Sequence, residues 1–211
     1  MAKKTLLRFG HCVPNAPAVD VWDGDETVLS GVSFGTVSGY LELASGIHSF
    51  AVTPVDGTRA DALSTAELDL RADRAYTLTV AGMLDTLTPM VYEDAPPGES
   101  IPAASCDVRL LHCSPNAPTL SLAVKGGPTV VEGVSFEDET TYERVDAGTY
   151  DLELRAVDSD DVLATLSGVD LAGGTARSMV VMDLVAGLRV EAVTDVGTPA
   201  STVADGRAAA R

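Results

Sequence analysis

The chain contains one short motif twice, and this repeat constrains its fold more than any other feature. HCVPNAP occupies residues 11–17, and HCSPNAP occupies residues 112–118. A constant offset across most of a chain marks an internal duplication, so two copies of one domain are expected. The offset stays at 101 or 102 residues for Arg8 with Arg109, GVSF at 31–34 with GVSF at 133–136, Tyr40 with Tyr142, and LDL at 68–70 with VDL at 169–171.

Composition along the chain separates the two copies. The segment APPGESIPAAS, at 95–105, is rich in Pro, Gly and Ser and is typical of a linker. The last residues, VGTPASTVADGRAAAR, show no apolar period and are expected to form a disordered tail. The predicted organisation is a first repeat at 1–96, a linker at 97–105, a second repeat at 106–195 and a tail at 196–211.

Each copy has the pattern of an all-β domain. Its apolar runs are short, rich in Val, Leu and Thr, and interrupted by Gly, Pro and Asp about every ten residues. No stretch of ten or more residues shows a helical period. This pattern predicts two tandem β-sandwich domains of the immunoglobulin/transthyretin-like kind. The strands expected in the first copy lie near 5–12, 18–22, 27–33, 38–43, 47–54, 63–70, 75–82 and 87–92.

The strand before the motif can be oriented, because residues two apart in a strand share a face. Leu7, Phe9 and His11 continue one apolar row and are expected to point inward. Cys12 lies on the other face with Arg8, so a straight strand cannot direct both His11 and Cys12 at one metal ion. The same alternation places Val108, Leu110 and His112 on one face and Arg109 and Cys113 on the other.

The PNAP segment after each His has the residues of a rigid corner. Each Pro fixes its own φ and holds its predecessor extended, and Asn favours turns. An inward His beside such a corner can bond loop amides that would otherwise be buried without partners. A metal site and an exposed ligand-binding corner are the alternatives. The residues of this structural motif are His11, Pro14, Asn15 and Pro17 in the first copy, and His112, Pro115, Asn116 and Pro118 in the second.

The chain has three cysteines, an odd number that argues against a disulfide framework. If the copies pack about a pseudo-two-fold axis, Cys12 and Cys113 can meet, as a pair or as a metal site shared with His11 and His112. The favoured alternative is that both are small buried residues on a sheet face. The orientation of the repeats, and whether Cys106 and the other two are free, paired or metal-bound, stay open.

Charge and hydropathy exclude several classes of partner. Asp and Glu number 31 against 14 Lys and Arg, a formal net charge of −17. A field of this sign repels nucleic acids and anionic lipid surfaces. The acidic excess and the presence of only three lysines suggest a halophilic archaeal protein, in which salt screens the self-repulsion. No apolar run reaches the ~18 residues of a membrane span, so no membrane insertion is expected.

Sequence signatures of catalysis are missing. The sequence holds no nucleophile elbow, Walker loop, Rossmann glycine pattern, HExxH or CxxC, and it points to no cofactor. Trp22 ends a strand of the first copy, where the second copy has Ala123. An aromatic side chain at that place either contacts a sugar or peptide ligand or caps the core.

The arrangement of these motifs resembles the domain of unknown function 4397 family. The matching segments are RFGHCVPNAPAVDVW, LSGVSFGTVSGYLELASG and RAYTLTVAG in the first copy, and RLLHCSPNAPTLSLAV and EGVSFEDETTYERVDAG in the second. The resemblance implies a tandem pair of the haloarchaeal type. Members of the family are mostly secreted or surface-attached, and no activity is established for them. The chain departs from the family pattern in having Cys after each His and in lacking an export signal.

Two functions from different classes remain. The first is a non-catalytic binding or structural module of a halophilic archaeon, associated with the cell envelope, whose partner is a protein or carbohydrate. The second is a metal- or thiol-dependent protein that uses the repeated His-Cys motifs. We expect a cytoplasmic location if the chain start is native, and an extracellular or cell-surface location if a leader was removed. The identity of the partner and the oligomeric state, a homo-oligomer included, stay open.

Overall fold

The computed structural model describes residues 3–195, and β-strands make up most of this part of the chain. Two short 3₁₀ helices, η1 (Arg59–Asp61) and η2 (Val185–Gly187), interrupt the strands. Within residues 3–195, no helix has the length and apolar character to cross a membrane. The first repeat holds β1 (Lys4–His11), β2 (Val19–Asp23), β3 (Glu26–Val32), β4 (Leu41–Ala44), β5 (Gly46–Pro54), β6 (Ser64–Leu70), β7 (Ala75–Met83) and β8 (Thr86–Glu93). The second holds β9 (Ser105–His112), β10 (Leu120–Val124), β11 (Thr129–Val134), β12 (Glu143–Asp146), β13 (Gly148–Ala156), β14 (Val162–Leu171), β15 (Thr175–Met182) and β16 (Arg189–Thr194).

Each repeat is a sandwich of two four-stranded sheets, and both repeats use the same strand order. In the first repeat the orders are β4-β1-β7-β8 and β3-β2-β5-β6, and in the second they are β12-β9-β15-β16 and β11-β10-β13-β14. The pairs β1/β7 and β9/β15 are parallel, whereas the other pairs are antiparallel. The predicted fold of two tandem β-sandwiches is therefore confirmed. The strands also fall close to the predicted ranges, except that β4 begins at Leu41, three residues later than expected.

Each sandwich encloses its own core. Leu7 and Phe9 of β1 pack with Leu78 of β7 against Val21 and Phe50 of the opposite sheet. In the second repeat, equivalent positions form a matching cluster around Leu110, Leu122 and Leu152. The alternation therefore predicted the inward rows correctly, and His11 and His112 continue them.

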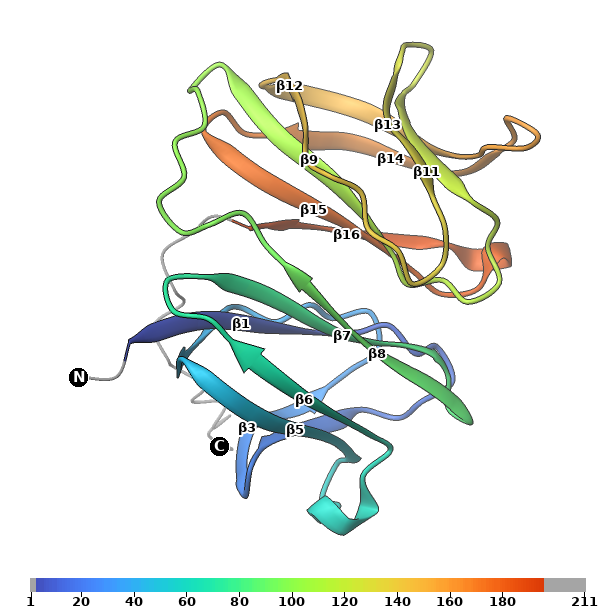
Figure 1. The fold of residues 1–211 in the computed structure, drawn as a ribbon. Helices are drawn as coiled ribbons and strands as arrows, with labels where there is room; N and C mark the ends of the chain where they lie inside the picture. Colours follow the sequence, from blue (N-terminus) through green and yellow to red (C-terminus); the bar gives the residue numbers. More distant parts are fainter. Residues whose placement is uncertain (1–2, 196–211) are drawn as a thin grey trace, which may run out of the picture.

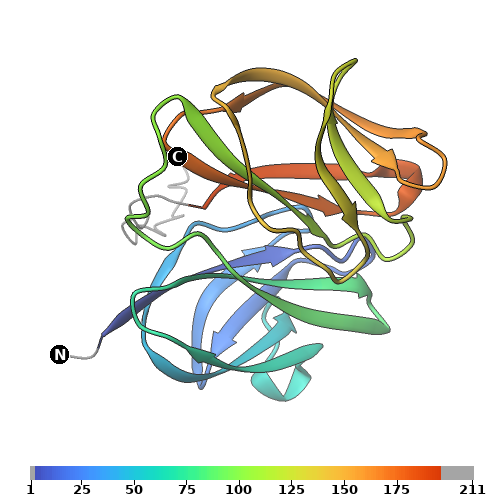
Figure 2. The ribbon, with the colours of Figure 1, turned by 45° about the horizontal axis from the view of Figure 1, so that its top comes forward.

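The two sandwiches stack into four layers, with the sheet containing β1 and β7 facing the sheet containing β9 and β15 (Figure 1, Figure 2). Strands of these inner sheets are buried on both faces, as β7 shows from Ala75 to Gly82. The segment between Glu93 and Ser105 is packed as well, because Ile101 contacts Ala95 and Ala176. The predicted tail at 196–211 lies outside the described residues, and the domain boundaries stay a prediction.

The repeated GVSF segment marks a distortion of the outer sheet. Gly31 and Gly133 adopt φ values of +67° and +68°, in the left-handed region that favours glycine. The pairing of β3 with β2 shifts its register beside Gly31, and the Gly31 amide donates to Asp20 Oδ1 at 2.8 Å. The backbone conformation explains why glycine stands at this position in both copies.

Candidate functional site at the interface of the two repeats

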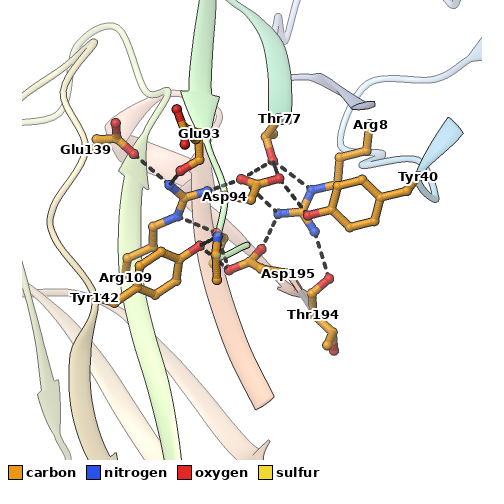
Figure 3. A network of polar contacts seen from close by, with 12 residues as sticks. Arg8, Tyr40, Thr77, Glu93, Asp94, Arg109, Glu139, Tyr142, Thr194 and Asp195 are labelled. Atoms are coloured by element: carbon orange, nitrogen blue, oxygen red, sulfur yellow. Dashed lines mark hydrogen bonds and ion pairs between the residues drawn. The ribbon is translucent and has the colours of Figure 1, made fainter. Parts of the chain in front are cut away.

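Two arginines from the inner sheets form the centre of the contact between the repeats (Figure 3). Arg8 of β1 donates through Nη2 to Asp195 Oδ1 and through Nη1 to the Thr194 carbonyl oxygen at 3.0 Å. Its Nε donates to Thr77 Oγ1, in the neighbouring strand β7, at 2.8 Å. Arg8 is therefore bonded to both repeats at once.

The second repeat makes the same contacts in the opposite direction. Arg109 donates to Asp94 Oδ1, to the Glu93 carbonyl oxygen at 3.0 Å, and to Ser178 Oγ at 2.7 Å. One further ion pair, to Glu139 Oε2 at 2.7 Å, has no counterpart at Arg8. This reciprocal pattern is that of a pseudo-two-fold axis between the repeats.

Two tyrosines complete the network. Tyr40 donates to Asp94 Oδ2 at 2.6 Å, and Tyr142 donates to Asp195 Oδ2 at 2.9 Å. Each ring also lies under an arginine of its own repeat, because the guanidinium carbons of Arg8 and Arg109 lie 4.8 Å from the ring centroids. Burial raises the pKa of both phenols, so they stay protonated and donate.

The network contains two buried charges of each sign. Arg8 and Asp195 have side chains that are 2% and 0% exposed, so neither ion is hydrated. Burial lowers the pKa of the Arg8 guanidinium, but the charges of Asp94 and Asp195 offset it and leave the pKa above its ordinary value. Paired charges with complete hydrogen bonding are the condition under which ions are tolerated in a protein interior.

An apolar cluster lies beside the charged network in the same interface. It contains Met90 and Tyr92 from the first repeat and Leu111 and Met182 from the second, together with both motif cysteines. Because the cluster draws on both inner sheets, neither repeat buries this surface alone. Burial of such side chains is worth about 1.5–3 kcal/mol each and supplies the non-directional part of the contact.

The structure brings Cys12 and Cys113 together at this interface. Both are completely buried free thiols, and both belong to the apolar cluster that the two repeats share. The contact with Cys113 and burial raise the pKa of the Cys12 thiol, so it is protonated at neutral pH. Cys106 lies apart, in the core of the second sandwich with Val108 and Leu110.

The two motif histidines face away from their cysteines. His11 Nε2 lies 3.0 Å from the Pro17 carbonyl oxygen, and His11 Nδ1 lies 3.3 Å from the Val13 amide nitrogen. His112 repeats both contacts, with Pro118 at 3.1 Å and Ser114 at 3.3 Å. A neutral imidazole protonated on Nε2 satisfies both partners, because it donates to the carbonyl and accepts from the amide.

The asparagines of the motif bond to a neighbouring hairpin. Asn15 Oδ1 accepts a hydrogen bond from the Leu84 amide at 2.9 Å, and Asn116 Oδ1 accepts one from the Val185 amide at 2.8 Å. Each contact joins the PNAP corner to the turn after β7 or β15. The sequence predicted a corner at this place but not the second element that it holds.

Two further aromatic positions lie away from the interface. Trp22 is half-buried and donates through Nε1 to Thr53 Oγ1 at 3.0 Å. His48 lies 2.6 Å through Nδ1 from Asp23 Oδ2, and its ring stacks on Phe50 at 5.8 Å. Neither residue reaches the motif histidines or cysteines through these contacts. Among residues 3–195, no group of three or more His, Cys, Asp or Glu side chains is placed to hold a metal ion.

Sequence reasoning missed the aspartates of the network. Asp94 and Asp195 are separated by 101 residues, the offset of the repeat, so the duplication itself carried the signal. The offset matched Arg8 with Arg109, and the alternation placed both on the strand face that points away from the core of their own sandwich. Only the stacking of the repeats shows that this face is buried.

Comparison with known proteins gives one family. A family model described as domain of unknown function DUF4397 matches residues 5–123 and 106–211, in two overlapping segments. No curated protein matches the sequence.

Two solved structures have low similarity to the chain. The first is the CBMbc module of family CBM26 from Eubacterium rectale Amy13K in complex with maltoheptaose, with 10% identity and a TM-score of 0.26, covering 93% of this chain and 98% of that one. The second is the TIE protein of Bacillus anthracis, with 11% identity and a TM-score of 0.27, covering 85% of this chain and 34% of that one. At these TM-scores, neither similarity bears on the function.

The charged network predicts strong coupling between Arg8 and Asp195. Removing one partner of a buried ion pair leaves an uncompensated charge, so Asp195→Asn is expected to lower the free energy of unfolding by about 3–5 kcal/mol. Arg8→Met together with Asp195→Asn should cost less than the sum of the single changes, by about 1–3 kcal/mol. Chemical denaturation at one salt concentration measures the free energy of unfolding of both single variants and of the double variant. Lys4→Met, which removes the exposed Lys4–Glu42 pair, is the matched control and should change little. Additive single and double changes would contradict the coupling.

The buried imidazoles predict a loss of stability in mild acid. Burial lowers the pKa of His11 and His112, and their carbonyl contacts only partly offset it. The unfolded chain therefore binds more protons between about pH 6.5 and the lowered pKa, and stability falls as the pH drops through this window. The slope is at most about 1.4 kcal/mol per pH unit for each imidazole.

Denaturation curves at several pH values test this expectation. The variant with both His11→Gln and His112→Gln should show a shallower fall below pH 6.5 than the unchanged protein. Because both proteins share every carboxylate, the difference in slope isolates the imidazoles. Equal slopes would show that these side chains do not change protonation on unfolding.

Proposed function

The chain belongs to the family of the domain of unknown function DUF4397, in both of its halves, and we propose that it is a non-catalytic module for binding or structural support. The observation that carries this proposal is the engagement of the repeated polar side chains. Arg8 and Asp94 pair with side chains of the other repeat, and Tyr40 donates to Asp94. His11 and Asn15 hold the backbone of the corner. Their equivalents in the second repeat make the same contacts.

A metal- or thiol-dependent function is the competing hypothesis, and the local geometry gives it little support. Both ring nitrogens of His11 already face backbone groups, so a metal would have to displace them. Cys12 lies on the opposite strand face from His11 and in a different cluster. We therefore assign the imidazoles to the fold and treat the two thiols as buried small residues.

The net charge of −17 supports a location in high salt, and the family resemblance to haloarchaeal surface proteins supports the cell envelope. At a Debye length of about 3 Å in 1 M salt, repulsion between exposed carboxylates is largely screened. A protein or carbohydrate is the proposed class of partner. The acidic surface disfavours nucleic acids.

Metal analysis and thiol titration separate the two functions. The purified protein should contain far less than one equivalent of metal after dialysis. Its three thiols should react with Ellman's reagent only when denaturant unfolds the chain, because all three are buried. Stoichiometric metal that is lost in the His11→Gln, His112→Gln double variant would overturn the proposal. So would rapid reaction of Cys12 or Cys113 in the native protein, measured with Cys106→Ser as the background.

The acidic composition predicts a salt-dependent stability. The melting temperature is expected to rise by about 5 °C or more between 0.1 M and 2 M KCl, since screening removes repulsion from the folded state. A variant in which Asp25, Glu26 and Asp158 become amides should show a smaller rise, because these side chains are exposed. An identical salt response in both proteins would show that surface repulsion is not the cause.

A further inference from the structure

A cavity of about 410 Å³ opens at the lateral edge of the second sandwich. It lies where β11, the edge strand of the outer sheet, approaches β12, the edge strand of the inner sheet. The start of β13 and the end of β14 close it from the interior. Its volume falls in the range of about 300–1,000 Å³ that small-molecule sites occupy.

The cavity has an apolar floor and a polar rim. The polar residues of its lining are exposed or half-buried: Thr129, Glu143, Arg144, Asp146 and Tyr150. This division suits a ligand with an apolar body and one polar head, because the body displaces water from the floor while the head stays near solvent. The apolar residues are Val124, Pro128, Val130, Val145, Leu152 and Leu171.

The rim is negatively charged. Arg144 is occupied by Asp107, to which it donates two hydrogen bonds at 2.7 and 2.8 Å. Among the ion pairs within residues 3–195, none involves Glu143 or Asp146. Lys125, in the neighbouring hairpin turn, does not line the cavity. Glu143 shares its face of β12 with Val145, whereas Arg144 and Asp146 lie on the other face. One carboxylate, that of Glu143, therefore faces the opening without a cation of its own.

The first repeat has different side chains and contacts at the equivalent place. Its Asp23 holds His48 through Nδ1, and the His48 ring stacks on Phe50. The second repeat has Val124, Tyr150 and Leu152 at these positions.

Each of these differences favours an opening. Val124 cannot accept a hydrogen bond, and Tyr150 bonds to the Asp146 carbonyl oxygen instead. Leu152 fills less volume than a phenyl ring. The two copies thus differ at this lateral edge of the sandwich, although both keep the residues that join the two repeats.

We propose that this cavity binds a small organic ammonium ion, and this inference rests on the proposed function as a binding module. The apolar body of the ligand lies against Leu152 and Val145. Its ammonium group lies at the rim beside the Glu143 carboxylate and the Tyr150 ring, whose face attracts cations.

Three six-carbon probes of equal length test both parts of the proposal. Hexylammonium carries a positive head, hexanol a neutral one and hexanoate a negative one. Titration calorimetry at one KCl concentration should show binding of one hexylammonium per chain, weaker binding of hexanol and none of hexanoate. Methyl NMR shifts should be confined to the valines and leucines of the cavity floor.

Variants locate the site. Glu143→Gln should weaken hexylammonium binding about twofold to fivefold and leave hexanol unchanged. Leu152→Phe, which introduces the residue of the first repeat, should abolish binding by filling the floor. If Leu152→Phe does not fold, Val130→Phe fills the cavity from the side of β11. Glu67→Gln, on the exposed part of β6 in the first repeat, is the matched control and should leave binding unchanged.

Several outcomes would overturn the proposal. These are equal binding of the three probes, absence of hexylammonium binding, methyl shifts in the first repeat, or unchanged binding in the filled variant. A failure here leaves the metal and thiol results untouched, so it is distinct from a failure of the proposed function. Conversely, stoichiometric metal on the motif histidines would overturn the proposed function without affecting this titration.

Discussion

The reciprocal pairing of Arg8 with Asp195 and of Arg109 with Asp94 fixes how the two repeats sit on each other. Apolar contact alone does not specify one orientation, because dispersion and the hydrophobic effect are nearly non-directional. Guanidinium groups donate in a fixed plane, so each arginine accepts only one placement of the opposing aspartate and carbonyl. The charged pairs therefore select the register of the interface, while the neighbouring apolar cluster supplies its non-directional part.

The contact between the repeats also determines which side chains the strands of each sandwich can carry. Leu7 and Phe9 face the core of the sandwich, and Arg8 faces the other repeat, so β1 is buried on both sides along nearly its whole length. A buried charge requires a complete set of partners. Thr77 accepts a hydrogen bond from Arg8, and Tyr40 donates one to Asp94. These contacts fix the position of β7, which holds Thr77, and of the segment before β4, which holds Tyr40. The repeated motif meets the same requirement at the corner, because His11 and Asn15 bond backbone groups that no strand satisfies.

Much of this architecture could be predicted from the sequence, because it follows from short-range patterns. The 101-residue offset revealed the duplication, and the period of two placed Leu7 and His11 on the inward face. The network was not predicted, since Arg8 and Asp195 are 187 residues apart and meet only after both sandwiches have formed. The partner of Asn15 is hidden for the same reason, because the Leu84 amide lies 69 residues away. The cavity depends on volume differences between buried side chains, which no pattern of apolar residues shows.

The divergence between the copies separates structural demands from functional ones. Residues that hold the repeats together recur in both, as Arg8 and Arg109 or Asp94 and Asp195 do, because the axis needs each of them from both sides. The lateral edge of each sandwich is formed by that repeat alone, so its residues need not match those of the other repeat. There the first copy has Asp23, His48 and Phe50, and the second has Val124, Tyr150 and Leu152. A duplicated fold can thus change the side chains at the lateral edge of one sandwich without any change at the interface between the repeats.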